Sequence, residues 1–219
     1  ALGFVFVPLI FLSVDLLTHK PRRGIIIGAL SVAATILSHN VFIIFVFLAA
    51  AYACVTLPRR AWWSLGVMLA TGIALSAYFW LPAIAELRFV RASQLIVANP
   101  QDHLVTLKDL IIPSWHYGPS SPGHPDSMSF QVGIVSLAVI LITLLTISKR
   151  SLIKFPVWLF TAVFLLALIL MHKISANWWR ILPAVGVIQF PWRLLAITTF
   201  ASAILASYLS QRHRFLSWL

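Results

Sequence analysis

The sequence predicts an all-α fold, a polytopic bundle of about seven transmembrane helices with a long extracytoplasmic loop that contains a short helix. Three observations predict this class. The chain is 61% hydrophobic and 10% charged, whereas soluble domains are about 45–50% apolar and about 25% charged. Its apolar residues form long runs, without the alternation at every second residue that a membrane β-barrel requires. Its basic residues gather in short segments between these runs.

Seven apolar runs approach the roughly 20 residues that a membrane-spanning helix needs. They cover residues 1–17, 24–38, 41–57, 62–86, 130–148, 155–172 and 193–210. We treat residues 1–219 as one transmembrane domain, in which residues 87–129 form a loop between the fourth and fifth spans. Because the chain opens at Ala1 inside an apolar run, we expect it to be an internal fragment of a longer protein.

The link between the second and third runs is expected to lie at membrane depth. Each of these runs has about 16 residues, which reach roughly 24 Å, less than the ~30 Å hydrocarbon core. Ser38, His39 and Asn40 would then lie below the outer surface, buried in protein or facing a wet cavity. Gly24 and Gly28 either allow another helix to approach closely or are simply two small residues near a helix start.

The basic links predict which loops face the cytoplasm. Alternate links carry several bases and no acid, namely Lys20, Arg22 and Arg23, then Arg59 and Arg60, then Lys149, Arg150 and Lys154, then Arg212 and Arg214. Short loops rich in lysine and arginine stay cytoplasmic. Loops 87–129 and 173–192 are therefore expected to be extracytoplasmic in a multi-pass protein of the cell membrane. The same rule accounts for the net charge of +11, so we expect membrane lipids and not nucleic acid as partners.

The long loop is expected to contain a short helix at residues 102–112. Leu104, Leu107 and Ile111 lie near helical spacing on one side of it. Pro113 would end this helix, because proline has no backbone N–H group and disfavours helical backbone in the residue before it.

The tryptophan-rich stretch 178–193 is typical of a segment that lies at a membrane surface and then turns into the bilayer. Its tryptophans fit an interfacial belt or a platform for a sugar. Arg193 begins the next apolar run, where a guanidinium suits a phosphate or carboxylate because it donates two parallel hydrogen bonds. The alternatives are that Arg193 reaches the lipid headgroups or pairs with Glu86. Gln189 and Trp192 are predicted to line the same substrate site.

His39 and Glu86 are the candidate catalytic residues, because ionisable groups at membrane depth are costly and usually functional. His39 could bind a substrate phosphate, act as a base or ligate a metal. The alternative is a structural role, in which its side chain is hydrogen-bonded between helices. Glu86 follows Pro82, which is expected to disrupt the fourth helix one turn below the surface. Its carboxylate suits a base, a metal ligand or the partner of an arginine, and is otherwise a solvated helix end.

Three further residues are predicted to contact the substrate. They are Asn40 beside His39, and Trp115 and His116 of the long loop. No local pattern demands a cofactor or a metal, although His39, Glu86 and His116 carry groups that can bind a divalent metal ion.

Several short motifs together resemble a family of prokaryotic multi-spanning membrane proteins. The motifs are Leu37-Ser38-His39-Asn40, Tyr78-Phe79-Trp80-Leu81-Pro82-Ala83 with Glu86, residues 115–118 leading into Met128 to Gly133, and Gln189-Phe190-Pro191-Trp192-Arg193. The family is labelled 6-pyruvoyl-tetrahydropterin synthase-related, a label that does not describe a pterin enzyme. These proteins are similar to the glycosyltransferase C superfamily, and the resemblance covers nearly the whole chain.

The resemblance implies a glycosyltransferase that takes its sugar from a polyprenyl-phosphate carrier at the outer face of the membrane. Members of the superfamily usually carry an acidic catalytic motif in the first outer loop. Here the first outer link is Ser38-His39-Asn40 and holds no acid. The resemblance therefore implies that the catalytic acid lies upstream of Ala1.

Taken together, the residues and the resemblance predict one outer cavity lined by His39, Glu86 and Arg193 and covered by Trp115 and His116. Two alternatives use the same residues or explain the missing acid. One is a transporter or flippase of a lipid-linked or anionic substrate, for which broken helices would be typical. The other is a non-catalytic membrane assembly subunit.

Overall fold

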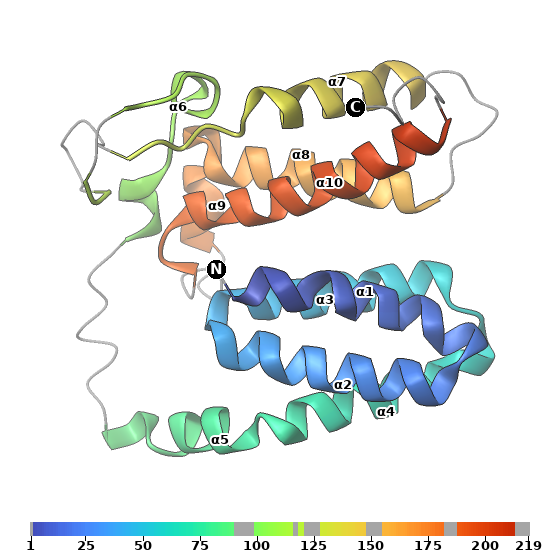
Figure 1. The fold of residues 1–219 in the computed structure, drawn as a ribbon. Helices are drawn as coiled ribbons and strands as arrows, with labels where there is room; N and C mark the ends of the chain where they lie inside the picture. The colour runs from blue at the N-terminus through green and yellow to red at the C-terminus, as the bar shows by residue number, and fades with distance from the viewer. Residues whose placement is uncertain are drawn as a thin grey trace. The chain divides into compact units, whose positions relative to one another are not determined.

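The structure is a computed structural model that describes residues 2–89, 99–115, 118–120, 128–147, 155–181 and 188–212. These residues form helices joined by loops, with one isolated bridge between Val105 and His172. The predicted all-α class is confirmed. The chain divides into two compact units, Ala1–Ile96 and Val97–Leu219, which we call unit 1 and unit 2 (Figure 1).

Unit 1 contains the first four apolar runs, and each of them is helical. Its elements are α1 (Gly3–His19), α2 (Pro21–Ser38), η1 (Asn40–Phe42), α3 (Ile43–Thr56), η2 (Arg59–Ala61), α4 (Trp62–Leu75), α5 (Ala77–Ala85) and η3 (Leu87–Phe89), where η marks a 3₁₀ helix. In Figure 1 the α1–α2 and α3–α4 links lie at one end of unit 1, and the α2–α3 link lies at the other.

The break in the fourth run lies at Ser76, and the expectation that Pro82 disrupts the helix is wrong. Pro82 lies inside α5, whereas α4 and α5 bend by 67° at Ser76. The Ser76 hydroxyl donates to the carbonyls of Gly72 at 3.2 Å and Ile73 at 2.9 Å. The Trp80 indole N–H donates to the Ile73 carbonyl at 3.0 Å. The Ser76 backbone N–H also donates to these carbonyls, at 3.3 Å to Gly72 and 3.2 Å to Ile73. Backbone, hydroxyl and indole donors therefore share the carbonyls at the break, where a proline would have no donor to offer.

Two glycines allow α2 to pack closely in unit 1. A Cβ atom on Gly24 would lie 2.9 Å from Leu17 Cδ2 and 3.0 Å from the Ser13 carbonyl oxygen of α1. A Cβ atom on Gly28 would collide with the Met68 side chain of α4 and lie 3.0 Å from Ser13 Cβ. Of the two interpretations of this glycine pair, the close approach of neighbouring helices is the one that the structure supports.

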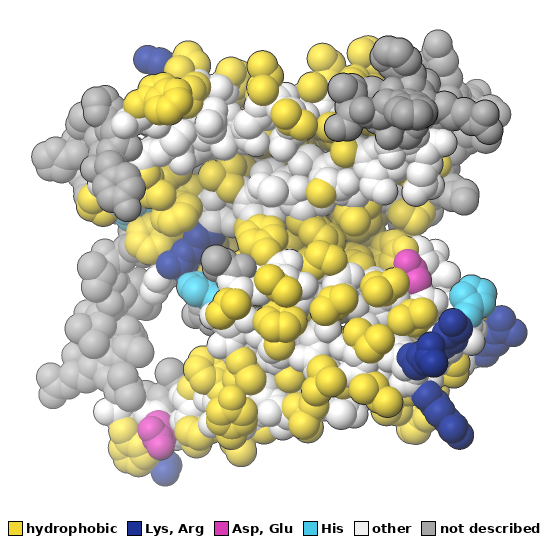
Figure 2. Space-filling view, viewed as in Figure 1, with side chains coloured by type: hydrophobic (Ala, Val, Ile, Leu, Met, Phe, Trp, Pro, Cys, Tyr) yellow, Lys and Arg dark blue, Asp and Glu magenta, His cyan; other side chains and the backbone are white. Residues whose placement is uncertain are grey.

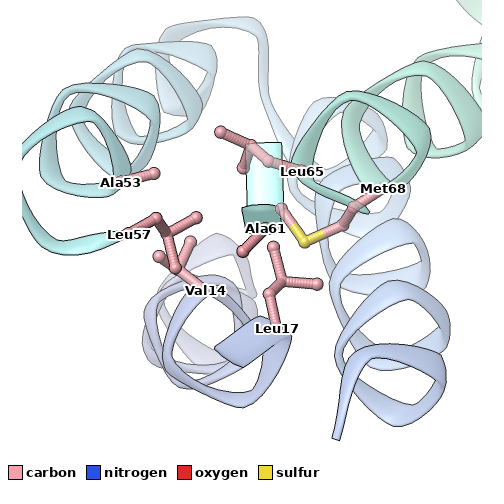
Figure 3. Close-up of a cluster of buried hydrophobic side chains, with 7 residues drawn as sticks. All are labelled: Val14, Leu17, Ala53, Leu57, Ala61, Leu65 and Met68. Carbon is pink, nitrogen blue, oxygen red and sulfur yellow. The ribbon is translucent and has the colours of Figure 1, made fainter. Parts of the chain in front are cut away.

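A hydrophobic cluster holds together the end of unit 1 that carries the α1–α2 and α3–α4 links (Figure 3). Its buried members are Val14, Leu17, Ala53, Leu57, Ala61, Leu65 and Met68. In Figure 3 the α1 side chains Val14 and Leu17 point toward Leu57 and Ala61. Because full burial of a leucine stabilises a fold by about 1.5–3 kcal/mol, these contacts fix the two links beside each other.

Unit 2 contains the remaining three apolar runs, which are also helical. Its elements are η5 (Pro100–His103), α6 (Leu107–Ile111), α7 (Ile134–Ile147), α8 (Phe155–Met171), η6 (Lys173–Ser175), α9 (Ala176–Ile181), η8 (Pro191–Leu194) and α10 (Leu195–Arg212). Helix α10 packs against α7 and α8. The short helix expected at residues 102–112 is present only in part, as α6, and Leu104 lies outside it in extended backbone. Thr106 and Asp109 cap α6 through a reciprocal pair of hydrogen bonds.

Most helices that the structure describes are shorter than the roughly 20 residues that cross a bilayer. Among the described residues one segment, Pro191–Gln211, is long and apolar enough to cross a membrane. The bent pair α4 and α5 would be a second such segment if the two helices together formed one span. Other apolar helices in the described residues are shorter, at 10–17 residues, or at most about 26 Å. Seven full-length spans are therefore not supported by these helix lengths, and the number of spans stays a prediction.

Candidate functional site

The segment before α10 has an unusual backbone. Gln189 has a φ of 52° and is the non-glycine residue with positive φ in the described part of the chain. Phe190 is extended, with a φ of −119° and a ψ of 103°, as expected before a proline. Pro191 then starts η8, whose first positions suit its fixed φ and missing N–H. Positive φ in a side-chain-bearing residue costs about 1–3 kcal/mol and often marks functional sites.

Aromatic rings gather around this segment in unit 2. The His103 and Phe190 ring centres lie 4.7 Å apart in an edge-to-face arrangement. The Phe190 and Trp192 centres lie 5.6 Å apart, and the Phe130 and Trp192 centres lie 5.9 Å apart. We call His103, Phe130, Phe190, Trp192 and Arg193 the Phe190 cluster. It joins η5, the start of the α7 segment and η8 at one end of unit 2.

Arg193 is the cationic member of the Phe190 cluster. Its guanidinium carbon lies 4.9 Å from the centre of the Phe190 ring, a cation–π contact. Its Nη1 donates a long hydrogen bond of 3.5 Å to the Ile188 carbonyl. The side chain is partly buried, and no carboxylate among the described residues forms an ion pair with it. Among the described residues the Ile188 carbonyl is the one hydrogen-bond partner of the guanidinium, which has five donors.

Trp192 supplies a second hydrogen-bond donor, its indole N–H. Its indole Nε1 is buried and has no hydrogen-bond partner among the described residues. A buried donor without a partner costs about 1–3 kcal/mol. An acceptor atom delivered by a ligand or by water would remove this cost.

His103 is a member of the cluster that sequence reasoning did not select. It is 4% exposed, and its Nδ1 lies 2.8 Å from Ser120 Oγ, within hydrogen-bond distance. The turn that places it is signalled in the sequence, because Asn99 caps η5 by accepting from the Gln101 N–H and Pro100 occupies its first position. The turn could be found from sequence, but the contact with Phe190 could not.

Backbone and side-chain hydrogen bonds tie η5 to the α8–α9 connection. The Val105 N–H donates to the Met171 carbonyl at 3.0 Å, and the Lys173 N–H donates to the Val105 carbonyl at 3.1 Å. The Gln101 amide joins both sides, since Nε2 donates to the Ala176 carbonyl at 3.3 Å and Oε1 accepts from Arg180 Nε at 3.2 Å. These bonds hold His103 in place.

The predicted catalytic residues lie in unit 1. His39 is exposed at the end of α2, where its Nδ1 accepts a hydrogen bond from the Val41 N–H at 3.2 Å. Glu86 is exposed at the end of α5. Asn40 begins η1, and the structure describes its backbone but not its side chain. The described residues show no hydrogen bond between His39 and Glu86, so catalytic roles for both stay predictions.

The predicted substrate-binding residues of the long loop and the tryptophan stretch belong to unit 2. Trp115 is 92% exposed, and His116 lies outside the described residues. Trp192 and Arg193 lie in η8 and Gln189 lies two residues before it, and a shared substrate site for the three stays a prediction. In the described part of the chain, no group of three or more His, Cys, Asp or Glu side chains could hold a metal ion.

Replacing His103 with alanine is expected to lower the free energy of unfolding by about 1–3 kcal/mol, because the change removes a partly buried hydrogen bond and the ring contact with Phe190. Thermal unfolding of the purified chain in detergent measures this. His19→Ala is the control, since His19 is exposed at the end of α1. Equal stabilities of the two variants would show that His103 does not hold the cluster.

Comparisons with known proteins gave no relative. No model of a protein family, no curated protein and no solved structure matches the chain.

Proposed function

We propose that this chain is a multi-spanning membrane protein, similar to the glycosyltransferase C superfamily, that binds a polyprenyl-phosphate-linked sugar at the extracytoplasmic face. The observation that carries the proposal is Arg193, a partly buried guanidinium without a carboxylate partner among the described residues. It lies at the start of Pro191–Gln211, the segment that is long and apolar enough to span a bilayer. Such a position is near the depth at which the phosphate of a lipid carrier lies.

The chemistry of the Phe190 cluster suits a sugar phosphate carried by a lipid. A guanidinium binds a phosphate through two parallel hydrogen bonds. The Trp192 N–H, which has no partner among the described residues, can donate to another oxygen of the same ligand. The partly exposed rings of Phe190 and Trp192 offer an apolar surface to a polyprenyl chain or a sugar face, and the buried Phe130 ring packs against Trp192. In a transfer reaction, donors of this kind would stabilise the leaving phosphate.

A transporter or flippase of the same lipid-linked substrate is the second candidate. The 67° break between α4 and α5 favours it, because broken helices at membrane depth are typical of transporters. Side chains of Ser76 and Trp80 satisfy the backbone at this break. Both candidate functions require the phosphate to bind at Arg193, and they differ in the step that follows.

The experiment measures binding of undecaprenyl phosphate to the full chain in nanodiscs. Arg193→Gln is expected to weaken binding about tenfold to a hundredfold, because hydrogen bonds to charged groups contribute about 1.5–3 kcal/mol. Arg193→Lys should bind more weakly than the wild type and more tightly than Arg193→Gln, since lysine keeps the positive charge but lacks the paired donors of a guanidinium. Arg88→Gln is the control, because Arg88 is exposed and is not a member of the Phe190 cluster or of the hydrogen bonds that support it.

Unchanged binding by Arg193→Gln would overturn the proposed phosphate site. Sugar transfer and lipid translocation separate the two candidate functions. Transfer of radiolabelled sugar from a polyprenyl carrier in membranes supports the transferase. Translocation without transfer, impaired by Arg193→Gln, supports the flippase.

A further inference from the structure

Five cationic side chains crowd one end of unit 1. They are Lys20, Arg22, Arg23, Arg59 and Arg60, which we call the basic end. All five are exposed, and none forms an ion pair with a carboxylate among the described residues. The nearest acid along the chain, Asp15, accepts a hydrogen bond from the Tyr52 hydroxyl at 2.9 Å. Figure 2 shows Lys and Arg side chains gathered at the end of unit 1 that bears the α1–α2 link.

The hydrophobic cluster of Figure 3 brings the two basic links together. Leu17 is three residues before Lys20, and Ala61 directly follows Arg60. Leu17 and Ala61 are 2% and 4% exposed and belong to the same buried cluster. The closeness of the two basic links is therefore set by the core of unit 1.

The α1–α2 link also forms a hollow. Lys20, Pro21, Arg22 and Arg23 line an open hollow of about 450 Å³ at the surface. Three of these four side chains are cationic, and Pro21 starts α2 directly after Lys20. The wall of this hollow is almost entirely apolar, so the stems of these side chains form it and their charged groups do not.

The fold gains no stability from this arrangement of charges. Arg22 and Arg23 lie in the first turn of α2, and Arg59 and Arg60 form η2 just before α4. Cations at the start of a helix oppose its dipole, and like charges held close together repel each other. Neither first turn contains an acid that would offset these costs. An anion bound between the links would lower these costs.

We propose that the basic end is a binding site for the headgroup phosphate of an anionic phospholipid, with phosphatidylglycerol as the representative ligand. The arginines hold the phosphodiester through paired hydrogen bonds, and the lysine adds charge. The site goes beyond the proposed function. It rests on the membrane location proposed above, but it does not depend on sugar transfer or on Arg193.

The test uses four Arg→Lys changes, at Arg22, Arg23, Arg59 and Arg60, in the full chain. This variant keeps every positive charge, so the orientation of the chain in the membrane, which basic loops determine, is retained. It removes the paired hydrogen-bond donors of the four guanidinium groups. Wild-type and variant chains are placed in nanodiscs that contain phosphatidylcholine with some phosphatidylglycerol. Mass spectrometry then measures the phospholipid that remains bound when the protein is released. The variant is expected to retain about tenfold less phosphatidylglycerol than the wild type.

Controls separate this site from diffuse charge and from the proposed function. Arg88→Lys, at an exposed arginine that contacts the Phe89 ring, should retain wild-type amounts. Equal retention by the wild type and the fourfold variant would overturn the proposal, because charge alone would then suffice. Displacement of the lipid by millimolar inorganic phosphate would also overturn it, by showing that the ligand is free phosphate. A wild type that enters nanodiscs but retains no phosphatidylglycerol refutes only this site, whereas failure to enter them refutes the membrane location as well.

Discussion

Replacing Trp179 with alanine is expected to lower the free energy of unfolding by about 3–5 kcal/mol, the range for truncation of a large buried aromatic side chain. Trp179 is 6% exposed. Its indole N–H donates to the Leu170 carbonyl at 3.0 Å and to Ser175 Oγ at 3.1 Å. The change leaves a cavity at the turn from α8 to α9 and removes both bonds. Chemical or thermal unfolding in detergent, followed by circular dichroism, measures the loss.

The neighbouring tryptophan provides a matched control for this prediction. Trp178 is 46% exposed, and Trp178→Ala removes the same atoms from a site with less packing around it. It should lower the free energy of unfolding by less than about 1 kcal/mol. If both variants lost the same stability, the burial of Trp179 would not be what holds the α8–α9 turn.

The positions of the helices could be predicted from the sequence, because long apolar runs become helices wherever the backbone must satisfy its own hydrogen bonds. All seven runs are helical in the described residues. The break in the fourth run was placed wrongly. The prediction treated Pro82 as a residue that breaks the helix. Pro82 instead lies inside α5, and the bend lies at Ser76. The decisive interactions are the hydrogen bonds of Ser76 and Trp80 to carbonyls, which depend on side-chain directions.

The candidate site could be predicted only where it is local. Gln189, Trp192 and Arg193 lie within one short segment, so the motif alone placed them together. His103 reaches this segment through a ring contact with Phe190, far along the chain, and no spacing rule reports such a contact. His39 and Glu86 were grouped with Arg193 from predicted membrane sides, and this grouping stays a prediction.

Gly28→Leu is the second large expected effect, and it tests the packing at the centre of unit 1. Even a Cβ atom at this position would collide with Met68 and lie 3.0 Å from Ser13 Cβ. A leucine must therefore push α2 away from α1 and α4, and we expect a loss of about 3 kcal/mol in the free energy of unfolding. The displacement should also loosen Val14 and Leu17, since they share the hydrophobic cluster with Met68.

Gly66 offers the control for this overpacking. It lies in α4, and a Cβ atom there would have nothing within 4 Å. Gly66→Leu should leave stability unchanged or raise it by up to about 1 kcal/mol, because leucine has the higher helix propensity. Unfolding of the two variants under the same conditions separates steric overlap from the loss of a glycine. A stable Gly28→Leu variant would show that α2 can move outward at little cost, and the close helix contact would then not hold the basic links in place.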